Sequence, residues 1–131
     1  MKIIEHFIGG KKYSGSSKRL SAVYNPATGE ETAKVKLGSS DDLNQSVQVA
    51  QNALANWSNT PPLQRARVLF KFKELIEKNE DELTKIIVSE HGKVYDDAKG
   101  SLNRGLEVVE YACGIPQMLK GEFTENVGKN V

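Results

Sequence analysis

The sequence predicts an α+β unit that is mostly α-helical, with a small antiparallel β-hairpin region followed by about four helices. Up to about residue 37, apolar and polar residues alternate in short runs, as half-exposed strands do. From Ser39 onward, apolar residues recur every three or four positions, as on one face of a helix. No strand–helix–strand alternation is visible, so the sequence predicts no parallel sheet. We expect a β-hairpin region at 6–37, a helical region at 39–120 and a linker at 121–131.

Turn-forming residues divide the β-hairpin region. Gly9 and Gly10 lie between two short runs and favour a two-residue hairpin, because both positions tolerate a positive φ. Residues 20–24 and 32–37 have the composition of further short strands. Between them, the segment 25–29 (Asn-Pro-Ala-Thr-Gly) is typical of a turn. A sheet of this size is marginally stable alone, so it needs a partner surface.

Two helices are predicted between residues 39 and 78. Ser39 and Ser40 can cap the first, with Asp41 and Asp42 in its first turn. Thr60 followed by proline predicts the start of the second at about Pro61, since proline is tolerated at the first helical position. The apolar stripes expected on the two helices are Leu43, Val47, Ala50, Leu54 and Trp57, and then Leu69, Phe72, Leu75 and Ile76.

Two more helices follow. The third is expected to end at Gly92, in the left-handed conformation that glycine favours after a helix. The fourth spans about 96–112, and Gly114 and Pro116 are expected to end it. Their predicted apolar faces are Leu83, Ile86 and Ile87, and then Leu102, Leu106, Val109 and Cys113.

Composition excludes several classes of function. The 131 residues contain 18 Lys and Arg against 17 Asp and Glu, so a net charge of +1 argues against a dedicated nucleic-acid binder. One cysteine excludes an internal disulfide, and two histidines, His6 and His91, are too few for an ordinary metal site. No apolar run reaches the ~18 residues of a membrane span. We therefore expect no membrane partner, no bound metal and a cytoplasmic location, with Cys113 reduced.

The sequence contains no evident catalytic constellation. Gly92-Lys93 lacks the other residues of a phosphate-binding loop, and Gly92 is better explained as a helix stop. Cys113 lies near a helix C-terminus on the apolar stripe, which predicts an inert buried thiol. Glu107 and Glu110 lie one turn apart and could serve acid–base chemistry, although a solvated helix face is the commoner explanation for such a pair.

Arg104 is the one candidate for ligand binding. Its neighbour Gly105 lies inside a predicted helix, where glycine costs about 1 kcal/mol relative to alanine. Such a glycine can allow close approach by another group. The Arg104 guanidinium would suit a carboxylate or a phosphate, which it can bind through two parallel hydrogen bonds. An ordinary surface arginine is the alternative.

Several segments together resemble the aldehyde dehydrogenase superfamily, over essentially all 131 residues. The segment 103–113, with its Arg-Gly-Leu-Glu-Val-Val-Glu run, narrows the resemblance to the CoA-acylating branch, the methylmalonate-semialdehyde dehydrogenases. The resemblance implies that the chain is the N-terminal portion of an α/β, Rossmann-type NAD-binding domain. The segments that carry it are 7–10 (Phe-Ile-Gly-Gly), 25–30 (Asn-Pro-Ala-Thr-Gly-Glu), 65–75 and 90–100.

This resemblance implies a function for the full-length protein. It would oxidise malonate or methylmalonate semialdehyde with NAD, lose carbon dioxide and transfer the acyl group to coenzyme A, as in valine catabolism. The products would be acetyl-CoA or propionyl-CoA, and the enzyme would be a homotetramer. The catalytic cysteine and the cofactor loop would lie beyond Val131. The segment would then hold no catalytic or cofactor-binding residue and would be inactive alone, and its exposed apolar helix faces could lead to self-association.

Arg104 matches the arginine that holds the carboxylate of the substrate in this branch, so the resemblance assigns it to substrate binding. Two alternatives stay open. One is another semialdehyde-acid dehydrogenase that does not use coenzyme A. The other is a free-standing helical interaction module from a truncated gene, for which cooperative melting of a monomer would be the test.

Overall fold

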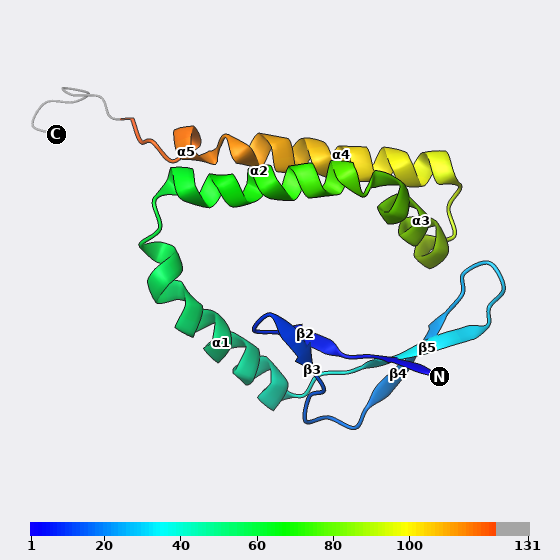
Figure 1. Ribbon diagram of the computed structural model, residues 1–131. Coiled ribbons are helices and arrows are strands. Elements are labelled where there is room, and N and C mark those ends of the chain that lie inside the picture. Colours follow the sequence, from blue (N-terminus) through cyan, green and yellow to red (C-terminus); the bar gives the residue numbers. More distant parts are fainter. Residues whose placement is uncertain (123–131) are drawn as a thin grey trace, which may run out of the picture.

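The computed structural model describes residues 1–122, which form five strands and five helices (Figure 1). The helices α2 and α4 lie side by side, α3 lies at one end of the pair, and α1 connects this helical layer to the strands. The strands are β1 (Lys2–Ile4), β2 (His6–Ile8), β3 (Lys11–Tyr13), β4 (Leu20–Tyr24) and β5 (Glu31–Lys36). The helices are α1 (Ser40–Ser58), α2 (Pro62–Lys78), α3 (Glu80–His91), α4 (Tyr95–Cys113) and α5 (Ile115–Met118).

Within residues 6–37 the strands pair antiparallel, as predicted, but the main sheet gains one parallel strand that was not predicted. Its strand order is β1-β5-β4, with β4 antiparallel to β5 but β1 parallel to β5 in the register Lys2↔Ala33. The prediction missed β1, which precedes the expected start at residue 6. A parallel pair needs a connection of a dozen or more residues but no helix in particular. Here the β2–β3 hairpin and β4 lie within that connection.

Both predicted turns are confirmed. Gly9 and Gly10 have φ angles of 63° and 77° and join β2 to β3, which pair with His6 opposite Tyr13. Gly29 has a φ of 73°, and its N–H donates to the Asn25 carbonyl at 2.8 Å. In both turns, glycine supplies the positive φ that other residues disfavour.

The two long N-terminal helices begin in different ways. The Ser39 side chain accepts a hydrogen bond from the Asp42 N–H, and the Asp42 carboxylate accepts one from the Ser39 N–H, so the predicted cap is confirmed. The predicted start of α2 at about Pro61 agrees with the structure, in which Pro61 is the N-cap and Pro62 the first helical residue. The Thr60 hydroxyl donates to the Asn56 carbonyl at 3.1 Å, and so contributes to the end of α1.

The end of α3 is confirmed, since Gly92 takes the left-handed conformation with a φ of 80°. α4 begins one residue earlier and ends one residue later than predicted, and Gly114 follows it. The short helix α5 was not predicted. Pro116 lies in its first turn, where a missing N–H costs no helical hydrogen bond, so the same proline that interrupts α4 allows a new turn to begin.

The buried core of the described residues is small. Its apolar members are Ala33, Ala66, Ala98 and Cys113. The predicted stripe of α4 packs toward α2, but the predicted stripe of α2 is only partly correct, because Phe72 and Leu75 are exposed. The stripe of α1 is also exposed, which agrees with the expectation of uncovered apolar helix faces. Its exposed members are Leu43, Val47, Ala50, Leu54 and Trp57.

Candidate functional site

Ser101, in the second turn of α4, connects the predicted site residue Arg104 to a second cation. Arg104 Nη2 donates to Ser101 Oγ at 3.0 Å, and Lys93 Nζ donates to the same oxygen at 2.9 Å. The Ser101 hydroxyl in turn donates to the Asp97 carbonyl at 3.0 Å. The structure thus brings together two cationic side chains from positions 93 and 104, on either side of the start of α4.

A tight contact fixes the backbone from which Lys93 extends. Gly92 lies against Pro26 so closely that a Cβ there would stand 3.1 Å from two carbons of the proline ring. The positive φ of Gly92 ends α3 and turns the chain toward α4. The segment 25–29 and the Gly-Lys pair, which are far apart in the sequence, therefore meet next to the site.

Neither cation is neutralised by an acidic side chain in the part of the chain that the structure describes. The ion pairs found within residues 1–122 involve other lysines: Lys34, Lys71, Lys73, Lys85 and Lys99. Arg104 is exposed and Lys93 is half-buried. Two adjacent positive charges without a negative partner favour the binding of an anion.

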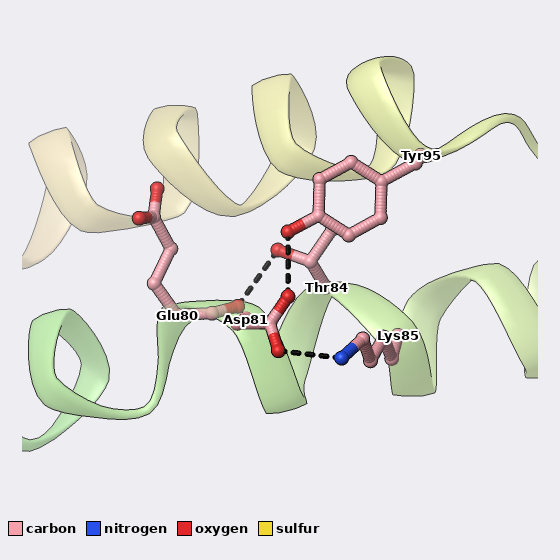
Figure 2. Close-up of polar contacts among 5 residues, drawn as sticks. All are labelled: Glu80, Asp81, Thr84, Lys85 and Tyr95. Atoms are coloured by element: carbon pink, nitrogen blue, oxygen red, sulfur yellow. Dashed lines mark hydrogen bonds and ion pairs between the residues drawn. The ribbon is translucent and has the colours of Figure 1, made fainter.

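Polar contacts between α3 and α4 fix the start of the helix that carries Arg104 (Figure 2). Tyr95 Oη donates to Asp81 Oδ1 at 2.9 Å, and Lys85 Nζ donates to Asp81 Oδ2 at 2.6 Å. The Lys85 hydrogen bond, together with that from Tyr95, lowers the pKa of the Asp81 carboxyl below its ordinary value. One turn along, the fully buried Thr84 donates to the Glu80 carbonyl at 2.7 Å. Asp81 thus stays ionised and holds the first residue of α4.

The surface around Arg104 is open and partly apolar. Val108 and Tyr111 follow Arg104 by four and seven positions, so the three residues share one face of α4. Both apolar side chains are well exposed, at 67% and 72%. A Cβ at Gly105 would meet nothing within 4 Å, so no group in the described part of the chain accounts for this glycine. The face combines apolar surface with a cationic end.

The remaining candidates do not form a second site. Cys113 is buried, as predicted, and Glu107 and Glu110 are exposed. His6 packs near Tyr13, and its buried Nε2 has no hydrogen-bond partner among residues 1–122, whereas His91 is exposed. Within residues 1–122, no three His, Cys, Asp or Glu side chains gather as metal ligands would. None of the described helices has the length and apolar composition needed to cross a membrane.

The sequence predicted a binding role for Arg104 but pointed to neither Lys93 nor Ser101, which the structure joins to it by hydrogen bonds. The sequence favours Gly92 as a helix stop over a phosphate-binding loop, and the segment 90–100 contributes to the family resemblance, but neither interpretation gives Lys93 a role. One signal was present: Asp97, Ser101 and Arg104 lie four and three positions apart, which places them on one face of a helix. The contribution of Lys93 depends on the direction of the turn at Gly92, which helical spacing does not give.

Comparison with known proteins places this segment in a larger context. Over all 131 residues, the chain is 45% identical to the malonate-semialdehyde dehydrogenase of Pseudomonas aeruginosa and covers 26% of that protein. It is 38% identical over 129 residues to malonate-semialdehyde dehydrogenase 1 of Geobacillus kaustophilus, again covering 26% of its length. The chain therefore spans about a quarter of these relatives and corresponds to their N-terminal part.

Solved structures give the same result. The methylmalonate-semialdehyde dehydrogenase of Oceanimonas doudoroffii matches with a TM-score of 0.90 and 49% identity, over 98% of this chain and 26% of that one. A Sinorhizobium meliloti protein assigned to the same activity, solved with NAD, matches with a TM-score of 0.90 and 47% identity over the same shares. The aldehyde dehydrogenase family matches residues 13–131. The chain belongs to the aldehyde dehydrogenase family.

Proposed function

We propose that this chain supplies the carboxylate-binding wall of a semialdehyde dehydrogenase that uses NAD and coenzyme A. The full-length enzyme would oxidise malonate or methylmalonate semialdehyde to acetyl-CoA or propionyl-CoA with loss of carbon dioxide. The observation that carries the proposal is the exposed Arg104 guanidinium, held by Ser101 at 3.0 Å on an open face of α4. A semialdehyde acid has a carboxylate at one end, and a guanidinium can orient it through two parallel hydrogen bonds.

The relatives support this choice of substrate and cofactor. Both curated relatives described above carry malonate semialdehyde in their names, and one similar structure was solved with NAD. The residues of this chain fit substrate binding better than cofactor binding, because the sequence contains no glycine-rich phosphate loop. We therefore place the cofactor loop and the catalytic cysteine in the part of the enzyme beyond Val131, and expect this segment alone to be inactive.

The remaining features of the full-length enzyme are part of the same proposal. We propose a cytoplasmic homotetramer that acts in valine catabolism. The exposed stripe of α1 and the exposed Phe72 and Leu75 of α2 would be covered by the rest of the chain or by another subunit. The segment without that cover would tend to self-associate.

The test is the substitution Arg104→Ala in the full-length enzyme. A lost hydrogen bond to a charged group should lower kcat/KM for malonate semialdehyde about 10- to 100-fold. It should leave kcat/KM for propionaldehyde, an uncharged aldehyde with the same carbon skeleton, nearly unchanged. Arg67→Ala, at an exposed arginine on α2, is the matched control. Equal losses for the two aldehydes would contradict the role of Arg104 as the carboxylate anchor.

A further inference from the structure

The Ser101 hydroxyl has all of its hydrogen-bonding capacity in use. A serine hydroxyl offers one hydrogen and two acceptor positions. The hydrogen is given to the Asp97 carbonyl at 3.0 Å, which lies one turn earlier in α4. The two acceptor positions receive Lys93 Nζ at 2.9 Å and Arg104 Nη2 at 3.0 Å. The donation to the helix backbone fixes the orientation of the hydroxyl, and the hydroxyl fixes both cations.

This arrangement keeps two positive charges close together. Both nitrogen atoms lie about 3 Å from a single oxygen, and among the described residues no carboxylate pairs with either. Like charges at such a separation repel each other, so an anion that contacts both groups relieves the repulsion. A neutral aldehyde cannot do this, whereas a carboxylate offers two oxygen atoms.

We propose that Lys93 is a second carboxylate-binding residue beside Arg104, and that Ser101 is the positioning residue for both. This inference rests on the proposed function, because it concerns the same substrate carboxylate. Lys93 is suited to the role because it is half-buried and its backbone is fixed between Gly92 and α4. The site thereby selects acid semialdehydes by two charges rather than one.

The test uses full-length enzyme and the ratio of kcat/KM for malonate semialdehyde to that for propionaldehyde. Lys93→Gln should lower this ratio about tenfold, the effect of losing one charged hydrogen bond. Lys93→Arg, which keeps the charge, should stay within about threefold of the parent ratio. Lys71→Gln, at an exposed lysine on α2, is the matched control and should leave the ratio unchanged.

Ser101 is tested by removing and restoring its hydroxyl. Ser101→Ala should lower the ratio about fivefold, mainly through a higher KM for malonate semialdehyde. Ser101→Thr should restore it, because a threonine hydroxyl can also donate to a carbonyl one turn earlier. A residue that served only the stability of α4 would change kcat/KM for both aldehydes by the same factor.

The outcomes separate this inference from the proposed function. If Arg104→Ala lowers the ratio while Lys93→Gln and Ser101→Ala do not, the two-cation site is wrong and the role of Arg104 stands. If none of the three substitutions lowers the ratio, both proposals are wrong. If Ser101→Thr behaves like Ser101→Ala although both variants melt like the parent, the positioning role of the hydroxyl is contradicted.

Discussion

Helices α1 and α4 have the same length and equally regular apolar stripes, but their environments differ. Each has 19 residues. The stripe of α4 packs against α2 and includes the buried Ala98 and Cys113. α1 packs extensively on no other helix or strand among the described residues, and its large apolar side chains are exposed. An apolar stripe therefore predicts a helix and a face that needs cover, but it does not say which part of the protein covers that face.

The two helices also differ in how they are held. α4 is fixed at its start by the Tyr95–Asp81 hydrogen bond and along its length by α2. α1 is fixed at its N-terminus, where the buried Asp42 accepts hydrogen bonds from Tyr13 and from the Ser16 N–H as well as from Ser39. Asp42 thus connects α1 to the strand region.

The two stripes should differ most in the loss of stability that an alanine-to-leucine substitution causes on each of them. Ala98→Leu inserts three carbons into a fully buried position and should destabilise the chain by about 3 kcal/mol. Ala50→Leu on the exposed face of α1 should change stability by less than about 0.5 kcal/mol. Urea denaturation of the 131-residue chain, followed by circular dichroism at a protein concentration at which the chain is monomeric, measures both. Similar losses in the two variants would mean that the α1 stripe is packed in solution.

A smaller difference in stability is expected when two glycines of positive φ are each replaced by alanine. Gly92→Ala should cost about 2 kcal/mol, because the left-handed conformation is strained for alanine and the new Cβ would stand 3.1 Å from Pro26. Gly29→Ala, with a similar φ but open space around it, should cost about 1 kcal/mol. Denaturation of both variants measures the extra cost of the Pro26 contact, and equal costs would show that Pro26 moves away from the new Cβ without loss of stability.

Asp42 holds the N-terminus of α1, and the stability that it contributes should depend on pH only in the acid range. The Ser39 and Ser16 N–H groups lower the pKa of Asp42 well below its ordinary value of 3.8. A carboxyl with a lowered pKa in the folded state contributes stability above the pKa of the unfolded chain and loses it as the pH falls. The parent chain should therefore lose this contribution below about pH 4, whereas Asp42→Asn should not show that loss.

Melting temperatures of the two proteins between pH 7 and pH 2.5 test this expectation. The difference in melting temperature between the parent chain and Asp42→Asn should be constant near neutral pH and become smaller in acid. A difference that stays constant down to pH 2.5 would show that Asp42 does not act through its charge.

The sequence by itself determined the four long helices, the cap of α1, the stop at Gly92 and the turns, because these depend on residues within a few positions of one another. Ser39 with Asp42, the Gly9-Gly10 pair and Gly92 each act through local backbone geometry. The sequence also made Arg104 a candidate for substrate binding, through its place beside a helical glycine and the resemblance of its segment to a known family.

Only the tertiary structure decided which distant segments meet. The parallel pairing of β1 with β5 and the contact of Gly92 with Pro26 join residues that no local pattern relates. The convergence of Lys93 and Arg104 on Ser101 depends on the direction in which the chain leaves α3. The periodicity of the sequence shows on which face of a helix a residue lies. Which other helix or strand covers that face is decided by the way the elements pack against one another.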